Sequence, residues 1–120
     1  MLNLDTHILV AVLEGRLSKA EELMVDKESL VVSDIVLWEI AMLVRHGRLD
    51  LDLDSVEFRR SLRYFMIVPI TLEIARQSTA LDFRSDPADE IIAATSIVER
   101  IPLLTRDRKI LRSRLVPLAG

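Results

Sequence analysis

The sequence predicts an α/β protein: one domain over residues 1–120 in which helices cover both faces of a mostly parallel sheet, a three-layer α/β/α sandwich. Short apolar segments alternate with longer helical segments along the chain, which is typical of parallel strands joined by helices. The length of 120 residues is enough for one hydrophobic core and too small for two. No internal repeat, low-complexity tract or linker interrupts this pattern.

Strand and helix signals alternate in the first half of the chain. Ser18 followed by Glu21 has the spacing of a capping box, and Gly47 stands where a glycine commonly ends a helix. The elements expected here are a strand at Leu2–Leu4, helices at His7–Glu14 and Ser18–Val25, a strand at Ser29–Val32, and a helix capped by Ser33 or Asp34 that runs through Arg45.

In the second half, proline residues mark element boundaries. Pro87 directly after Asp86 is a strong start signal, because aspartate caps a helix and proline fits its first position. Pro69 closes the strand before it. The elements expected here are a helix at Asp54–Tyr64, a strand at Met66–Val68, helices at Thr71–Leu81 and Pro87–Glu99, a strand at Leu103–Thr105, a helix at Arg108–Arg112 and a last strand at Leu115–Pro117.

Composition excludes several classes of protein. Half of the residues are hydrophobic and only 4% are aromatic, so aliphatic side chains must build the core. The absence of cysteine excludes disulfides, thiolate zinc sites and cysteine nucleophiles, and fits a cytoplasmic protein. The longest apolar stretches are shorter than the roughly 20 residues that span a bilayer. The N-terminus MLNLDTH has neither the basic region nor the cleavage site of a signal peptide.

Charge is unevenly distributed along the chain. The net charge of −3 argues against a protein that coats nucleic acid broadly. The region from Arg100 to Arg114 is basic, with Asp107 as its one acid. Either phosphate contacts or solvated arginines on a short surface helix explain this region equally well. The candidates for contacts with an RNA backbone are Arg106, Arg108, Lys109 and Arg112.

Four acidic residues stand where an apolar segment meets a helix: Asp5, Glu39, Asp89 and Asp107. Asp5 and Asp107 follow expected strands, and the other two lie in the opening turns of expected helices. Parallel sheets bind ligands beyond the carboxyl ends of their strands. We therefore expect all four carboxylates to gather at one edge of the sheet.

Each acid also has a structural interpretation. Asp5 and Asp107 are in position to cap the helices that follow them, and Asp89 can be the reciprocal acid of a capping box that starts at Asp86. Asp86 itself is better explained as a cap. Glu39 is the exception, because its helical neighbours three and four residues away are all apolar. A lone ionised carboxylate on such a face is costly, so Glu39 should be paired, protonated or bound to a cation.

Gathering four carboxylates at one place has an electrostatic cost. Two such charges about 4 Å apart repel by about 4 kcal/mol at an effective dielectric of about 20, and without a cation some of them stay protonated. An all-oxygen site suits Mg²⁺ or Mn²⁺ rather than zinc or copper. The chemistry typical of such a site is hydrolysis of a phosphodiester by activated water.

Other polar residues near the acids are weaker candidates. Thr6 and Thr105 flank Asp5 and Asp107, and can orient a ligand or cap a helix. His7 and His46 are the only histidines, and a metal-free cleavage by this pair is the less favoured alternative. Trp38 is most simply a core residue. No glycine-rich phosphate loop exists among Gly15, Gly47 and Gly120, which argues against binding of nucleoside triphosphates or dinucleotides.

Four segments together resemble the PIN domain, specifically the VapC-type ribonuclease toxins of VapBC toxin–antitoxin pairs. They are LDTHILV around Asp5, VVSDIVLWEIAML around Glu39, DPADEIIAATSIVE around Asp89 and LLTRDRKI around Asp107. The resemblance covers essentially the whole chain. It implies a PIN-like fold and an acidic cluster of Asp5, Glu39, Asp89 and Asp107 that holds Mg²⁺ or Mn²⁺.

The same resemblance implies a function and partners. It implies a metal-dependent endoribonuclease that acts as the toxin of a type II pair, with RNA as substrate. It also implies a small cognate antitoxin and a homodimer or toxin–antitoxin hetero-oligomer. The positive mean hydropathy of +0.28 agrees, because apolar surface marks protein interfaces. The chain departs from the usual pattern at Glu90, where related toxins carry Arg, and at Phe83-Arg84-Ser85, where many carry His or Lys.

Two functions of other classes compete with this hypothesis. A PIN-like scaffold that has lost catalysis would act only through a protein partner. A receiver-like phosphoacceptor also has a parallel sheet with acids at its strand ends, but it needs paired acids after the first strand and a late lysine. Here the first strand ends in Asp5 alone, and Lys109 lies on the wrong side of Asp107.

Overall fold

A computed structural model describes all residues, 1–120. Its four strands form one parallel sheet in the order β3-β2-β1-β4. The elements, in chain order, are β1 (Leu2–Leu4), α1 (Thr6–Glu14), α2 (Lys19–Lys27), β2 (Leu30–Ser33), α3 (Asp34–Arg45), α4 (Val56–Leu62), β3 (Phe65–Val68), α5 (Leu72–Ser78), α6 (Pro87–Glu99), β4 (Leu103–Leu104) and α7 (Arg108–Leu111).

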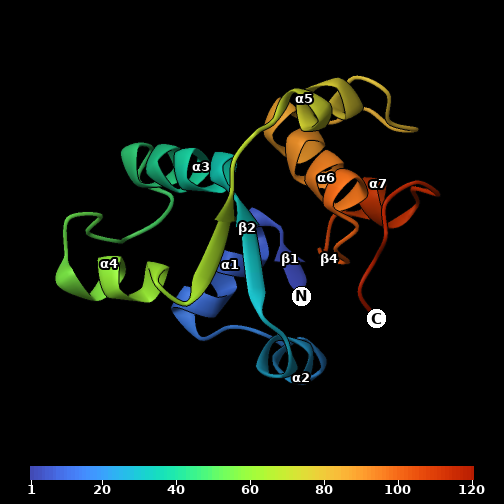
Figure 1. Cartoon of the computed structure of the whole chain (residues 1–120). Coiled ribbons are helices and arrows are strands. Elements are labelled where there is room, and N and C mark those ends of the chain that lie inside the picture. The colour runs from blue at the N-terminus through green and yellow to red at the C-terminus, as the bar shows by residue number, and fades with distance from the viewer.

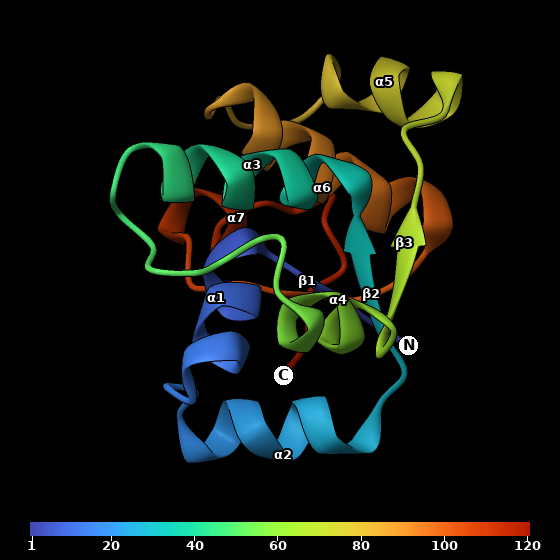
Figure 2. The same ribbon diagram turned by 90° about the vertical axis from the view of Figure 1, so that its left-hand side faces the viewer.

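Helices cover both faces of the sheet. In Figure 1, α1, α3 and α4 lie on one side of the strands and α5, α6 and α7 on the other. Figure 2 shows the same layers turned by 90°, with α2 beyond one end of the strands. The predicted three-layer α/β/α sandwich with a parallel sheet is confirmed. No helix is long and apolar enough to cross a membrane.

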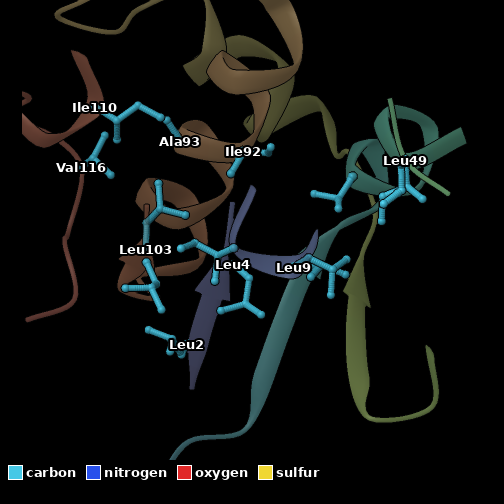
Figure 3. Close-up of a cluster of buried hydrophobic side chains, with 14 of the residues drawn as sticks. Leu2, Leu4, Leu9, Leu49, Ile92, Ala93, Leu103, Ile110 and Val116 are labelled. Carbon is cyan, nitrogen blue, oxygen red and sulfur yellow. The ribbon is translucent and has the colours of Figure 1, made fainter. Parts of the chain in front are cut away.

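The core is aliphatic, as the composition predicts. Adjacent residues of β2 point to opposite faces, so Val32 joins the main cluster while Val31 joins a smaller one with Val68, Ile74 and Ala94. Figure 3 shows the main cluster, to which β1, α1, α6 and the C-terminal segment all contribute. Each fully buried aliphatic side chain of this kind stabilises the fold by about 1.5–3 kcal/mol.

Helix starts follow the capping signals. The capping box of Ser18 and Glu21 is present, and Ser33, rather than Asp34, caps α3. Two predicted helices are shorter than expected at both ends: Ser55 and Thr71 are the N-caps of α4 and α5 rather than helical residues, and the two helices end at Leu62 and Ser78. Gly47 has a positive φ of 69° just after α3, as a helix-ending glycine does.

The prediction that Asp86 caps α6 is wrong in its detail. Asp86 occupies the N-cap position and Pro87 the first helical position, but the Asp86 side chain accepts no capping hydrogen bond. Instead, Glu90 Oε2 accepts the backbone N–H of Ser85 at 3.2 Å. Glu90, one turn into α6, therefore fixes the segment of chain that precedes this helix.

Two further predictions are wrong. No strand forms at Leu115–Pro117; instead, a single parallel bridge joins Leu118 to Leu103. Ser113 Oγ accepts the N–H groups of Leu115 and Val116, and Pro117 has none, so the donors that a strand needs are missing. Trp38 is not a core residue, since it is 56% exposed. The buried face of α3 is set by Val36 and Ile40, and a residue midway between them points away from it.

Candidate functional site

The four predicted acids come from three layers of the fold and meet at the carboxyl edge of the sheet. Strands β1 and β4 pair in parallel through Leu4 and Leu104, so Asp5 and Asp107 leave the sheet at the same edge. Glu39 lies in the second turn of α3, which follows β2 directly, and Asp89 lies in the first turn of α6. This arrangement is the one expected from the ends of parallel strands.

Asp5 is the most enclosed of the four. Its side chain is buried, and both carboxylate oxygens accept hydrogen bonds: Oδ1 from Thr6 N at 2.8 Å and Oδ2 from Thr105 Oγ1 at 2.6 Å. Asp5 is also the N-cap of α1. The capping interpretation and the site interpretation therefore both apply to one residue.

The two threonines link the acids to one another. Thr6 Oγ1 donates a hydrogen bond to Glu39 Oε1, while its backbone N–H donates to Asp5 Oδ1. Thr105 Oγ1 donates to Asp5 and accepts the N–H of Asp107 at 3.0 Å. Both threonines are buried. Both side chains therefore orient carboxylates of the cluster. The sequence predicted that they either orient a ligand or cap a helix, and neither alternative named this role.

Asp89 is positioned by a residue that sequence reasoning did not single out. Ser85 Oγ donates to Asp89 Oδ2 at 3.0 Å, while the Ser85 N–H donates to Glu90. Asp89 is therefore not the reciprocal acid of a capping box; Glu90 accepts the backbone N–H of the entering chain. The signal that could have found Ser85 is a hydroxyl four residues before an acid at a helix start.

Asp107 is the N-cap of α7, as predicted. Its Oδ1 accepts the N–H groups of Lys109 at 2.8 Å and Ile110 at 3.2 Å. Its Oδ2 has no hydrogen-bond partner in the protein and is free for another ligand. The Asp107 carboxylate therefore caps α7 through Oδ1 and keeps Oδ2 for another ligand, unlike Asp5, whose two oxygens both accept hydrogen bonds.

Burial and mutual repulsion make three of the acids reluctant to ionise. The pKa values of Asp5, Glu39 and Asp89 are raised, and the largest cause in each case is desolvation of the carboxylate by burial. The charge of Asp107 also raises the pKa of Asp5 and Asp89, and the charges of Asp5 and Asp89 raise the pKa of Glu39. The hydrogen bonds from Thr105, Thr6 and Ser85 act in the opposite direction. The four acids thus form one electrostatically coupled group.

The carboxylates are close to one another without forming a closed metal cage. No group of three or more histidine, aspartate or glutamate side chains is arranged to hold one metal ion. The donor set still fits Mg²⁺ or Mn²⁺, because Mg²⁺ keeps several waters and needs only one or two carboxylates. Free oxygens remain on Glu39, Asp89 and Asp107. The metal and its ligands stay a prediction.

The two histidines differ in position. His7 is exposed in the first turn of α1, and its charge lowers the pKa of Asp5 and Glu39, so it lies near the acids. His46 is exposed at the C-cap of α3, at the other end of that helix from the acids. The structure does not bring the two together as an acid–base pair.

The predicted basic contacts also divide into two kinds. Arg106 forms a two-point ion pair with Glu21, with Nε–Oε2 at 2.8 Å and Nη2–Oε1 at 2.7 Å. Arg108, Lys109 and Arg112 are exposed on or after α7 and make no salt bridge. A role for these four residues in RNA contact stays a prediction.

The parallel α/β/α sandwich and the acidic cluster at the carboxyl edge of its sheet place this protein among small α/β domains with a carboxylate site. Within that class, the family model for the PIN domain matches residues 3–114. The chain belongs to the PIN domain family. The predicted family is confirmed, and the receiver-like alternative is set aside.

Individual relatives agree with this assignment. The chain is 32% identical over 120 aligned residues to Ribonuclease VapC22 of Mycobacterium tuberculosis (strain ATCC 25618 / H37Rv), covering 95% of this chain and 92% of the relative. Its fold is similar to that of a toxin–antitoxin complex from Klebsiella pneumoniae, with a TM-score of 0.76, 22% identity, and 100% and 97% of the two chains covered. It is also similar to VapBC2 from Rickettsia felis bound to a DNA fragment from their promoter, with a TM-score of 0.71, 20% identity, and 99% and 98% covered.

Proposed function

We propose that this protein is a metal-dependent endoribonuclease and the toxin of a type II toxin–antitoxin pair. The observation that carries the proposal is the group of four coupled carboxylates, in which Asp5, Glu39 and Asp89 have raised pKa values and Asp107 keeps a free oxygen. Such an arrangement is unfavourable without a cation. The likeness to a ribonuclease of the VapC kind supports RNA as the substrate.

The chemistry follows from the placement of the acids. Asp5 and Asp89 would hold the ion and position the attacking water, and Glu39 and Asp107 would complete the cluster through their free oxygens. A bound Mg²⁺ or Mn²⁺ supplies activation of that water and charge stabilisation at the phosphate. Attack in line on phosphorus breaks the bond to the 3′ oxygen, which leaves a 3′-hydroxyl and a 5′-phosphate. Thr6, Thr105 and Ser85 keep the carboxylates oriented throughout.

The proposed partner is a small antitoxin. Solved structures with this fold include a toxin–antitoxin complex, and large apolar side chains are exposed here on and around the edge strand β3, including Tyr64, Met66 and Leu72. Exposed apolar patches mark protein interfaces. A helix laid on such a surface, with an Arg or Lys reaching the carboxylates, would satisfy both features. The protein encoded beside this gene should raise its thermal midpoint; an unchanged midpoint and solubility would contradict this partner.

The test is cleavage of a total-RNA pool in Mg²⁺ or Mn²⁺, compared with EDTA and with the isosteric Asp89→Asn variant. Loss of cleavage in both controls, with 5′-phosphate and 3′-hydroxyl ends on the fragments, is the expected result. A 2′,3′-cyclic phosphate on the fragments, or cleavage that survives EDTA, would contradict the mechanism. The first of these outcomes would point to His7.

Two observations favour a second function. No three side chains are arranged to hold one metal ion, and Asp5 and Asp107 both have capping roles. A PIN-like binding module that acts only through its partner would show the same features. It would bind no Mn²⁺ and cleave no RNA while still binding the antitoxin, whereas the ribonuclease does all three.

A further inference from the structure

A cavity of about 620 Å³ opens beside the acidic cluster. One wall is a face of α1, because residues at positions i, i+3 and i+4 of a helix share a face. The other wall comes from the turn after α1 and from the segment that follows β4, so that Asp107 belongs to both the cavity and the cluster. The lining residues are His7, Val10, Ala11, Arg16, Arg106 and Asp107.

Arg106 is held in this wall by three hydrogen bonds. Glu21 binds its Nε and Nη2 atoms, and Nη2 also donates to the carbonyl oxygen of Arg16 at 3.4 Å. Glu21 is itself fixed, because its Oε1 also accepts the N–H of Ser18 in the capping box of α2. The Nη1 group of Arg106 has no partner in the protein. The guanidinium is therefore pre-oriented with one amino group unused.

Arg16 is brought to the same cavity by a turn that requires glycine. Gly15 has a φ of 68°, and the chain turns there so that Arg16 N donates to Ala11 O at 2.8 Å. The Arg16 side chain is 71% exposed and pairs with Glu14. An exposed ion pair of this kind is weak, so Arg16 can exchange Glu14 for a phosphate at little cost. The His7 ring makes no hydrogen bond in the protein.

We propose that this cavity binds one nucleotide of the RNA strand beside the phosphodiester that is cleaved. The nucleotide's phosphate would contact Arg16 and the free Nη1 of Arg106, and its sugar would lie on Val10 and Ala11. The volume lies in the range of small-molecule sites, and planar guanidinium groups suit phosphate oxygens. The inference rests on the proposed ribonuclease function.

A basic subsite has a physical purpose at this position. Four carboxylates repel the phosphates of an approaching strand, so affinity must come from cations at the border of the cluster. Arg16 and Arg106 are the arginines in the cavity that Asp107 also lines. A protein partner would need more apolar wall than Val10 and Ala11 provide, and RNA is therefore the favoured occupant.

The test is fluorescence anisotropy with short single-stranded RNA of random sequence, in Ca²⁺ so that binding is measured without cleavage. Arg16→Ala should weaken binding about tenfold, as expected for one charge-assisted contact, and should reduce the slope of log affinity against log salt by about 0.7. Val10→Trp fills the cavity without changing charge, so it should weaken binding and leave the slope unchanged. Arg59→Ala is the matched control, because Arg59 is also 71% exposed, pairs with Asp54 and does not line the cavity.

The outcomes separate the two levels of the proposal. If Arg16→Ala and Val10→Trp both bind RNA as tightly as Arg59→Ala, the cavity is not a nucleotide subsite, while the ribonuclease proposal survives. If these variants instead weaken only the binding of the antitoxin and leave RNA binding unchanged, the cavity belongs to that partner and the inference is wrong. If the unmodified protein binds no RNA, the proposed function itself fails. Thermal unfolding of each variant checks that it is folded.

Discussion

The carboxylates of the acidic cluster and the single carboxylate of Glu21 experience opposite electrostatic environments. At the carboxyl edge of the sheet, desolvation by burial raises the pKa of Asp5, Glu39 and Asp89. In the first turn of α2, hydrogen bonds from Arg106 lower the pKa of Glu21 to about 2. Glu21 lies nearer the surface than the cluster acids, although its side chain is only 12% exposed. Burial and partner therefore both differ: Glu21 faces a guanidinium, whereas the more deeply buried cluster acids face hydroxyls and one another.

This comparison distinguishes a carboxylate that stabilises the fold from carboxylates that destabilise it, as those of a functional site commonly do. An acid that gains a cation on folding stabilises the folded state, whereas an acid that loses water and gains like charges destabilises it. Three hydroxyl donors, Thr6, Thr105 and Ser85, only partly offset that cost. A destabilising group held in a defined orientation is typical of a functional site.

The largest expected effect is on activity. Asp5→Asn should reduce RNA cleavage in Mg²⁺ by more than about 100-fold, because it removes a proposed ligand and not merely a residue that orients one. The matched control is Asp54→Asn, an exposed acid of α4's N-terminal region, which should cleave normally. Equal rates for the two variants would remove Asp5 from the chemistry.

A smaller loss is expected when the orienting hydroxyl is removed. Ser85→Ala should reduce Mn²⁺ affinity and cleavage by about tenfold, as changes to groups that orient metal ligands do, and Ser85→Thr should restore much of both. The control is Ser61→Ala, whose hydroxyl donates to the Glu57 carbonyl. If Mn²⁺ affinity, measured by calorimetry, does not change in Ser85→Ala, the 3.0 Å bond to Asp89 has only a structural role.

Glu21→Gln removes the ion pair with Arg106 and should destabilise the protein at pH 7 by about 1 kcal/mol. The loss is small because the Arg106 side chain is partly exposed and solvent screens the pair. The pKa of Glu21 is lowered from 4.5 to about 2, so its contribution is present above pH 4.5 and is lost as the pH falls toward 2. Denaturant unfolding across that range measures it. The neighbouring Glu22→Gln, an exposed acid of the same turn, should change little at any pH.

Glu39→Gln should have the opposite sign. Because the folded-state pKa of Glu39 is raised above 4.5, its ionisation costs stability, and this cost appears as the pH rises through the raised value. In EDTA at pH 7, the variant should be more stable than the unmodified protein, and the difference should vanish as the pH falls below 4.5, where the carboxyl group is protonated in both the folded and the unfolded state. A destabilised variant at pH 7 would mean that the Thr6 hydrogen bond outweighs the burial of charge.

Sequence patterns predicted most of the fold and the gathering of the four acids at one edge of the sheet. Alternating segments and the capping signals at Ser18 and Pro87 depend on local chemistry, so they can be read from spacing. The gathering of the acids also followed, because Asp5 and Asp107 are tied to the ends of strands. The family resemblance was confirmed by the match over residues 3–114.

What could not be predicted depends on contacts between distant residues. Glu21 and Arg106 are 85 positions apart, and nothing local shows that this arginine is already paired. Trp38 looked like a core residue because its neighbours are apolar, yet the face of α3 that packs is decided by tertiary contacts. The strand expected at Leu115–Pro117 failed because Ser113 takes two of its backbone donors.

The measurement that tests the central claim most directly is thermal and chemical unfolding at pH 7 with Mn²⁺ or with EDTA. If the cluster is completed by a cation, Mn²⁺ at about 100 times its dissociation constant should stabilise the unmodified protein by about 2.7 kcal/mol. The same Mn²⁺ should have little effect on Asp89→Asn, which should already be more stable in EDTA. Equal responses of the two proteins to Mn²⁺, or no response in either, would contradict the account.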